Sequence, residues 1–271
     1  MGDALRHAPG LLTLAHARTG AGPRPLVLLH GLLGSARNLS SLARLLSARG
    51  PEFSVVALDL PGHGSSPPLP PVADSDLLAR EVLATVATLG LATPLSLVGH
   101  SLGGRVALRA AQRDPARVTS VTLLDIAPGP FAAGGEVSRV LDILLRAPDV
   151  VASRADARAL LVGADLGAAL AEWLLLNLES ADRGYRWKVD RPALAALHTR
   201  IATEDLWPAV EGPRDYAVRC VRGAASGYVS DADARRLQAA GCPVVTIDGA
   251  GHFLHVERPE AVADAVLASL A

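Results

Sequence analysis

The segment from Leu95 to Gly104 reads LSLVGHSLGG, an apolar run that breaks into Gly-x-Ser-x-Gly and then continues with helical spacing. The apolar run predicts a buried strand, and residues 102–113 predict a helix that packs against it. A turn this sharp forces Ser101 into strained backbone angles, and the flanking glycines avoid clashes where strand and helix approach. The pattern therefore predicts a serine hydroxyl at a helix N-terminus, where main-chain N–H groups meet developing negative charge.

Two further segments supply groups that a reactive serine needs. An early apolar run, PLVLL, ends in HGLLG, a glycine turn that leaves the N–H of Leu32 free. We expect this N–H and that of Leu102 to form an oxyanion hole. Near the other end of the chain, the run VVTI leads into GAGH, which puts His252 in a loop after a late strand. We therefore expect Ser101 to be a nucleophile and His252 its general base.

With these motifs the chain resembles the α/β-hydrolase family. The resemblance is carried by HGLLGS at 30–35, DLPGHGSS at 59–66, GHSLGG at 99–104 and GAGHFLHVERPE at 249–260. Two further motifs, LLDIAPGP at 123–130 and RGYRWKVDRPAL at 183–194, resemble small bacterial esterases and thioesterases and their mitochondrial relatives. In those relatives a short helical lid covers the serine. The resemblance implies the α/β-hydrolase fold and a triad of serine, histidine and an acid.

Apolar strands alternate with helical segments along most of the chain. After a short strand or hairpin near 10–18, we expect strands near 26–30, 54–59, 95–100, 118–125, 216–222 and 243–248, and helices near 38–49, 76–89, 102–113, 231–240 and 259–270. Continuous apolar strands that alternate with helices predict an α/β fold with a mostly parallel central sheet and helices on both faces.

The alternation stops between Pro130 and Pro213. No strand pattern stands out there, but amphipathic segments recur near 137–145, 155–161, 168–178 and 192–201. We therefore predict an α/β-hydrolase core of residues 1–129 and 214–271, with an inserted helical lid (cap) of residues 130–213. The insert leaves the core after one strand and returns before another. This predicts a position above the carboxyl ends of the strands, where open α/β sheets bind ligands.

The acid of the triad departs from the commonest pattern. In most relatives it follows the penultimate strand as Gly-x-x-Asp, but here VRGAAS puts Ser226 at that position. A serine carries no charge that stabilises an imidazolium. We expect Asp125 to be the acid, because its strand should lie between those of Ser101 and Ser226, and the lid-bearing esterases that this chain resembles use that position. Asp231 is the next candidate, with capping of the following helix as its alternative role. Ser226 is expected to hydrogen-bond His252 or Asp125.

The other histidines in the motifs have simpler explanations. His30 and His63 are expected to order loops rather than to act as bases. His100 is expected to pack or to form hydrogen bonds beneath the turn. His255 falls at a helix start, which makes it a weaker candidate for the base than His252.

Aromatic residues make up only 3% of the chain, whereas half of all residues are hydrophobic, so we expect an aliphatic core. Against this background a group of aromatic residues in the insert stands out: Trp173, Tyr185 and Trp187. They are candidates to line a substrate pocket for the acyl group. Packing of the insert on the core is their alternative role.

The balance of 26 basic and 27 acidic residues, for a net charge of −1, indicates no nucleic-acid or membrane partner. The N-terminus, MGDALRH, lacks a signal-peptide pattern, and no apolar run approaches membrane-spanning length, so we expect a cytoplasmic protein. Cys220 and Cys242 are expected to be buried reduced thiols rather than a disulfide. No metal-ligand spacing and no dinucleotide fingerprint is present, which predicts catalysis without a metal or other cofactor.

These observations favour a serine carboxylesterase or thioesterase that cleaves short to medium acyl chains through an acyl-enzyme. Other reactions use the same triad: those of a lactonase, a cofactor-free perhydrolase, a carbon–carbon bond hydrolase or a menaquinone-pathway lyase. The alternative from another class is a ligand sensor on the hydrolase scaffold with little turnover. A serine in the turn argues against haloalkane dehalogenases and epoxide hydrolases, because those branches resemble one another in carrying aspartate there.

Overall fold

A seven-stranded sheet forms the centre of the computed structural model, which describes residues 13–131 and 135–270. Its strands are β1 (His16–Thr19), β2 (Arg24–Leu29), β3 (Phe53–Leu58), β4 (Leu95–His100), β5 (Val118–Leu124), β9 (Ala217–Gly223) and β10 (Val244–Ile247). Their spatial order is β1-β3-β2-β4-β5-β9-β10, and of these strands β1 alone runs antiparallel to its neighbour. The expected mostly parallel sheet is confirmed. Residues 10–12 of the expected N-terminal strand lie outside the described residues.

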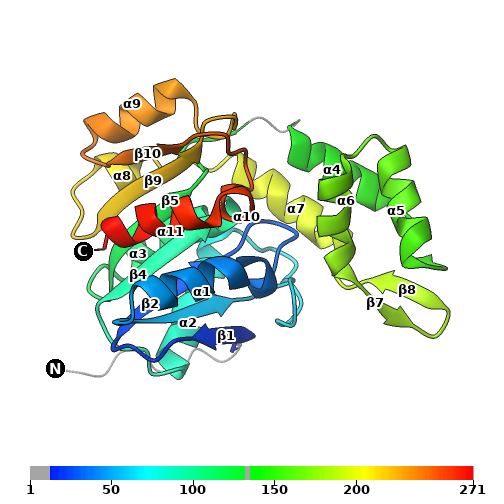
Figure 1. Ribbon diagram of the computed structural model, residues 1–271, viewed down its shortest axis with the longest axis horizontal. Helices are drawn as coiled ribbons and strands as arrows, with labels where there is room; N and C mark the ends of the chain where they lie inside the picture. The colour runs from blue at the N-terminus through cyan, green and yellow to red at the C-terminus, as the bar shows by residue number, and fades with distance from the viewer. Residues whose placement is uncertain (1–12, 132–134, 271) are drawn as a thin grey trace.

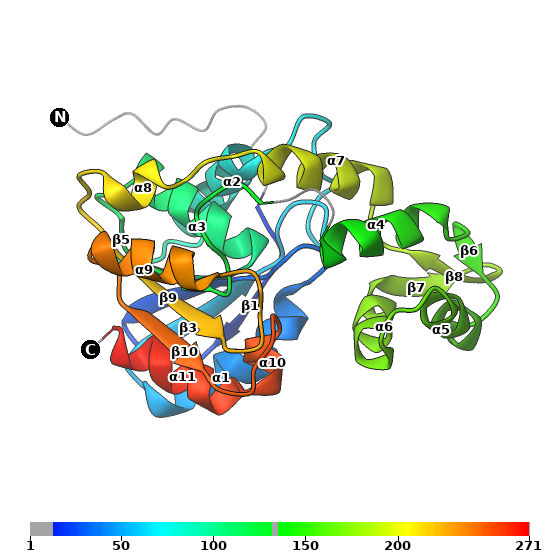
Figure 2. The same cartoon turned by 90° about the horizontal axis from the view of Figure 1, so that it is seen from above.

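Helices cover both faces of this sheet (Figures 1 and 2). On one face lie the 3-10 helix η1 (Ala36–Leu39), α1 (Ser40–Arg49), α10 (Leu254–Glu257) and α11 (Pro259–Ala268). On the other lie α2 (Ser75–Thr88), α3 (Leu102–Arg113), α8 (Pro208–Glu211) and α9 (Asp231–Ala239). The expected helices of the core are therefore present.

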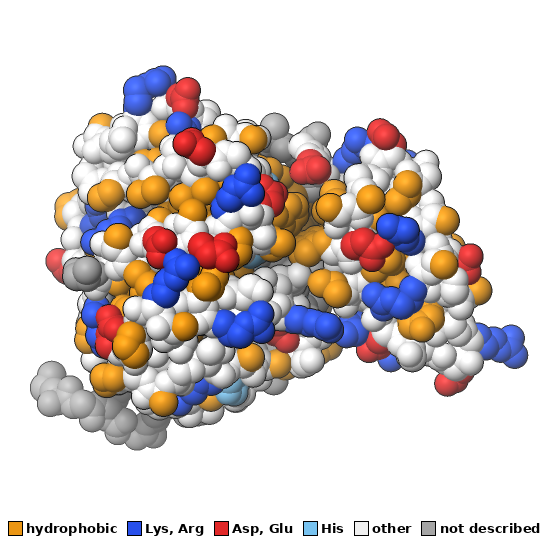
Figure 3. All heavy atoms as spheres, viewed as in Figure 1, with side chains coloured by type: hydrophobic (Ala, Val, Ile, Leu, Met, Phe, Trp, Pro, Cys, Tyr) orange, Lys and Arg blue, Asp and Glu red, His pale blue; other side chains and the backbone are white. Residues whose placement is uncertain are grey.

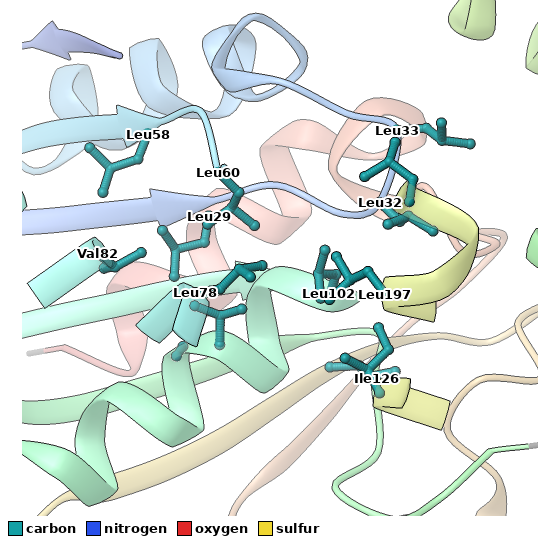
Figure 4. Packing of buried hydrophobic residues seen from close by; sticks show 14 of the residues in the cluster. Leu29, Leu32, Leu33, Leu58, Leu60, Leu78, Val82, Leu102, Ile126 and Leu197 are labelled. Atoms are coloured by element: carbon teal, nitrogen blue, oxygen red, sulfur yellow. The ribbon is translucent and has the colours of Figure 1, made fainter. Parts of the chain in front are cut away.

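Alternate residues of each central strand enter two separate cores. Leu26 and Leu28 pack in the cluster with α1 and α11, whereas Val27 and Leu29 pack in the cluster with α2 and α3. Successive side chains of a strand point to opposite faces, so a strand buried on both faces has to be apolar throughout. The second cluster continues into the insert through Leu197, which gathers with Leu102 and other leucines at the carboxyl end of the sheet (Figure 4).

The insert, defined as residues 130–213, contains both helices and strands. Its helices are α4 (Glu136–Arg146), α5 (Arg154–Gly163), α6 (Ala168–Leu174), the 3-10 helix η2 (Leu175–Asn177), α7 (Arg191–Ala202) and the short α8. A second, three-stranded antiparallel sheet has the order β6-β8-β7, with β6 (Val150–Val151), β8 (Gly184–Trp187) and β7 (Leu178–Ala181). The insert is therefore mainly helical, as expected, but it also contains three short strands that the sequence analysis did not predict. These strands have two to four residues, too few to give a readable alternation, and their hairpin turn depends on Gly184 at φ +94°.

The part of the insert from α4 to α7 lies beside the core at the carboxyl ends of the parallel strands, on the right of Figure 1, whereas α8 packs against the core. Where the chain enters and leaves the part from α4 to α7, the buried guanidinium of Arg105 in α3 donates to the carbonyls of Gly129 (2.8 Å) and Glu204 (2.6 Å). Asn177 at the end of η2 donates through Nδ2 to the carbonyl of Leu33 (2.9 Å). The insert is thus held on the core by α7, by both of its connections and by η2.

Across the described residues, no helix combines the length and apolar character needed to cross a membrane. Met1–His7, the segment on which the expected cytoplasmic location partly rests, lies outside those residues, and that location stays a prediction. Cys220 and Cys242 are free and buried, as expected, and burial raises the pKa of both thiols.

Candidate active site

Backbone strain is concentrated where the predicted site residues lie. Four non-glycine residues in the described part of the chain have positive φ, and three of them are Leu33 (64°), Ser101 (51°) and Asp125 (52°). They follow β2, β4 and β5, whose carboxyl ends meet at one edge of the sheet. Positive φ is uncommon for residues with a Cβ and persists only where the surrounding structure enforces it. The strain therefore points to this edge of the sheet as the candidate functional site.

Close packing beneath Ser101 explains the glycines around it. A Cβ on Gly99 would collide with the main chain of Gly103, and a Cβ on Gly103 would collide with the main-chain carbonyl of Leu29. Strand and helix approach so closely here that neither position has room for a side chain. The serine N–H donates to the carbonyl of Leu124 (3.0 Å), which ties the turn to the next strand.

We expect Gly103→Ala to lower the free energy of unfolding by about 1–3 kcal/mol, because the added methyl group must push main-chain atoms apart. Urea unfolding of the purified variant measures this loss. Gly163→Ala is the matched control, since a Cβ at Gly163 would meet nothing within 4 Å and alanine favours the helix. If Gly103→Ala unfolded at the same urea concentration as wild type, the close approach of β2 and α3 would not be a constraint.

Asp125 and His252, which are 127 residues apart in the sequence, are in direct contact. Oδ2 of Asp125 lies 2.8 Å from Nδ1 of His252. The aspartate side chain is fully buried and that of the histidine is 8% exposed. Oδ1 of Asp125 accepts the N–H of Gly223 (2.9 Å), and Oδ2 also accepts the hydroxyl of Ser226. The carboxylate is thus held by three donors, one of which is the imidazole.

This arrangement selects one tautomer of the histidine. A carboxylate accepts hydrogen bonds, so Nδ1 of His252 carries the proton and donates it to Asp125. Nε2 is then left unprotonated and is able to accept a proton from a hydroxyl. Asp231, the next candidate for the acid, pairs instead with Arg222 (2.7 Å), and the residue that caps α9 is Ser230. Asp231 therefore does not cap the helix, and its carboxylate is engaged away from the imidazole.

Ser101 and His252 line one small cavity between the core and the insert, of about 30 Å³. Figure 3 shows the surface hollowed between these two parts, with hydrophobic side chains gathered in the hollow. The insert contributes Glu136, Val137, Val140, Leu170 and Trp173 to the lining. A second cavity of about 510 Å³ adjoins it and shares Glu136, Val137 and Tyr228 with it.

Leu32 and Leu102 meet beside Ser101, where all three line a further small cavity. Leu102 is the first residue of α3, where a helix leaves its N–H groups without an intrahelical acceptor. Leu32 lies in the turn closed by the hydrogen bond from the N–H of Gly34 to the carbonyl of Gly31 (3.0 Å). Neither amide donates to a protein acceptor within the described residues. Both residues therefore stay candidates for the expected oxyanion hole.

Of the predicted pocket residues, only Trp173 lines the cavity. The centroid of its ring lies 5.2 Å from that of Phe253. Tyr185 and Trp187 lie on β8, at the far end of the insert in Figure 1. The Trp187 indole donates to the carbonyl of Pro148 (3.0 Å), and the Tyr185 ring lies under the guanidinium of Arg154. For these two residues the expectation of a pocket role is wrong, because they pack the small sheet of the insert.

The other four histidines of the motifs, His30, His63, His100 and His255, are buried. His30 accepts the N–H of Leu60 at Nε2 (2.9 Å) and donates from Nδ1 to the carbonyl of Gly31 (2.8 Å), which orders the turn of Leu32. Nε2 of His100 lies 2.8 Å from the carbonyl of His252. Burial lowers the pKa of His30 to about 3, of His63 to about 4 and of His255 to about 3, and places that of His100 well below its usual range. These side chains are therefore neutral in the folded protein.

We expect the folded state to lose stability as the pH falls below 6.5. The unfolded chain takes up protons on His30, His63 and His255 near pH 6.5, whereas the folded chain does so only near pH 3 to 4. At pH 5.5 the loss is roughly 1 kcal/mol for each of His30, His63 and His255. Urea unfolding at pH 7.5, 6.5 and 5.5 measures it, and His63→Gln should show a correspondingly smaller fall. A stability that is constant between pH 7.5 and 5.5 would contradict this prediction.

Several residues near the site were not predicted from the sequence, and three of them make specific contacts there. Tyr228 and Phe253 line the cavity, and Asn177 bonds the strained turn of Leu33. Phe253 follows His252 directly, and Tyr228 lies two residues after Ser226, so proximity to predicted site residues was the available signal. No cluster of three or more His, Cys, Asp or Glu side chains in residues 13–131 and 135–270 is arranged to hold a metal ion.

Comparisons with known proteins extend over nearly the whole chain. A model of the alpha/beta hydrolase family matches residues 26–265. sn-1-specific diacylglycerol lipase ABHD11 of Mus musculus is 30% identical over 258 residues, which are 91% of this chain and 80% of that protein. Lipase LipV of Mycobacterium tuberculosis is 34% identical over 78% of each chain. The solved structure of a marine microorganism esterase, 26% identical, covers 94% of this chain and 98% of its own with a TM-score of 0.84.

Proposed function

The chain belongs to the alpha/beta hydrolase family, and we propose that it is a carboxylesterase-type serine hydrolase that cleaves carboxylic esters or thioesters. One observation carries this proposal: the buried carboxylate of Asp125 is hydrogen-bonded to the imidazole of His252. His252 in turn lines the same cavity as Ser101. The names of the similar proteins, two lipases and an esterase, support the same reaction class.

In the proposed reaction, Oγ of Ser101 attacks the carbonyl carbon of the substrate while Nε2 of His252 takes its proton. The N–H groups of Leu32 and Leu102 stabilise the negative charge on the carbonyl oxygen. The tetrahedral intermediate expels the alcohol or thiol, which receives the proton from the imidazolium, and an acyl-enzyme remains. The imidazole then activates a water molecule that hydrolyses the acyl-enzyme and restores the serine.

We assign short acyl chains to the small cavity beside the serine. Its volume of about 30 Å³ accommodates a few water-sized groups, and its lining is mostly apolar. The adjoining cavity of about 510 Å³ has room for the rest of the substrate, and its lining includes Glu136, Asp205 and Arg236. In this proposal the insert acts as a lid, because five of its residues line the small cavity.

A panel of p-nitrophenyl esters and matched thioesters, from acetyl through butyryl and octanoyl to lauroyl, tests this function. We expect many turnovers per enzyme, a kcat/KM that falls towards lauroyl, and rapid labelling of Ser101 by a fluorophosphonate probe. Peptide mapping identifies the labelled residue. A single slow turnover without further product, or failure to label Ser101, would contradict the proposal and would favour a ligand sensor.

A further inference from the structure

The aromatic ring of Tyr228 lies flat against the imidazole of His252. The ring centroids are 3.7 Å apart and the planes differ by 17°. The other rings that the structure describes beside this imidazole meet it at steeper angles, His100 at 44° and Phe253 at 67°. The reaction proposed above gives Tyr228 no role. Its π face is nevertheless the aromatic surface that covers the imidazole.

The chain holds this ring in place through the groups that hold the triad. The N–H of Tyr228 donates to Oγ of Ser226 (3.2 Å), and that hydroxyl donates to Asp125. The N–H of Ala225, the residue before Ser226, donates to the carbonyl of Ala250 (2.9 Å) in the loop that carries His252. The aromatic ring and the imidazole are therefore positioned by one connected set of hydrogen bonds.

The charged and titratable groups around His252 are few. Asp125 contacts the edge of its ring, and Glu136 lines the same cavity from the insert. His100 and His255 also lie near it, but burial lowers the pKa of both, so neither carries a charge at neutral pH. The phenol of Tyr228 is likewise uncharged, because burial raises its pKa to about 12. The aromatic ring therefore acts on the imidazole through its π face.

We propose that Tyr228 is a positioning residue that stabilises the imidazolium form of His252 during the reaction. This inference rests on the proposed function, in which the ring becomes a cation only when it takes the proton of Ser101. An aromatic face carries negative charge density and attracts a cation more strongly than a neutral ring. The stacking is therefore stronger in the transition state than in the resting enzyme, which is the condition for an interaction to raise kcat/KM.

The test compares Tyr228→Leu with Tyr228→Phe. The leucine variant loses the π face, so we expect kcat/KM for p-nitrophenyl acetate to fall about 2- to 30-fold. Without the aromatic face the imidazolium forms less readily, so the acid limb of the kcat/KM profile should move to lower pH by about half a unit to one unit. The phenylalanine variant keeps the π face and loses only the hydroxyl group, so its acid limb should stay where it is in wild type and its kcat/KM should fall less than that of the leucine variant.

Stepwise fluorination tests the same point without changing the shape of the ring. Replacing Tyr228 with phenylalanine and then with its increasingly fluorinated analogues withdraws charge density from the π face. The acid limb should move progressively to lower pH along this series. A loss of rate with no movement of the acid limb would reduce Tyr228 to a packing role and overturn the proposal. A phenylalanine variant as impaired as leucine would overturn it too.

NMR titration of the His252 ring separates this proposal from the proposed function. The ring signal is assigned with His252→Gln, and its titration midpoint is measured in wild type and in the Tyr228 variants without any substrate. If wild type cleaved no ester but the midpoint still fell in the leucine and fluorinated variants, the function would be wrong and the role of Tyr228 supported. An unchanged midpoint in an active enzyme would overturn only the role of Tyr228.

Discussion

Ser101→Ala is expected to lower kcat for p-nitrophenyl ester hydrolysis by about five to six orders of magnitude. The variant loses the atom that attacks the carbonyl, while the oxyanion donors and the cavity remain and sustain a small residual rate. Stability should hardly change, because alanine has the same Cβ as serine and adopts the same φ of 51° at the same cost. Steady-state kinetics at saturating substrate and urea unfolding measure both quantities.

Ser226→Ala is the matched control for this prediction. Ser226 lies in the same site and donates to Asp125, but it lies outside the small cavity that Ser101 lines. We expect the fluorophosphonate probe to label the Ser226 variant and not the Ser101 variant. A Ser101→Ala enzyme that kept a tenth of its activity and still bound the probe covalently would show that another nucleophile is used.

The turn at Ser101 was predictable because its constraints are local. Strand, turn and helix are contiguous in sequence, and Gly99 and Gly103 are required by an approach that involves their own neighbours and the end of β2. The hydrophobic pattern predicted the core strands for a similar reason. A strand buried on both faces leaves a continuous apolar run, so β2 and β4 are visible without knowledge of what covers them.

The contact of Asp125 with His252 follows from sheet order more than from any local signal. The sequence predicted that the strand of Asp125 lies between those of Ser101 and Ser226, and the observed order β4-β5-β9 agrees. The carboxyl ends of neighbouring parallel strands meet at one edge, which brings these residues together. The sequence did not predict the positive φ of Asp125 or the hydrogen bond that its carboxylate accepts from the N–H of Gly223.

The positions of the aromatic residues relative to the site could not be predicted from the sequence. Tyr185 and Trp187 were chosen as pocket candidates because aromatic residues are rare in this chain. Rarity says nothing about distance from Ser101, and both residues pack a hairpin at the far end of the insert. Tyr228 stacks on His252 across a separation of 24 residues, and the two residues lie in the separate loops that follow β9 and β10. A contact between two loops leaves no periodic hydrophobic pattern in the sequence from which it could be predicted. The short strands of the insert escaped prediction because they span too few residues for a period to appear.

Asp125→Asn is expected to lower kcat by about 10⁴-fold with the fold intact. The amide can keep its oxygen towards the N–H of Gly223, which leaves its NH₂ group facing Nδ1 of His252. An NH₂ group donates, so Nδ1 must become the acceptor and the ring proton moves to Nε2. In that tautomer the imidazole cannot take the proton of Ser101. Steady-state kinetics and urea unfolding of the purified variant test both parts of the expectation.

Asp231→Asn is the control that decides between the two acids. The Asp231 carboxylate pairs with Arg222 on the surface, and its side chain is 76% exposed, so we expect activity within about twofold of wild type. Ser226→Ala should fall between the two variants with a loss of about tenfold, because it removes one hydrogen bond to the buried carboxylate and leaves the charge. The order of these three effects is the test. If Asp231→Asn lost more activity than Asp125→Asn, the buried carboxylate would be a structural anchor and the imidazole would depend on another acid.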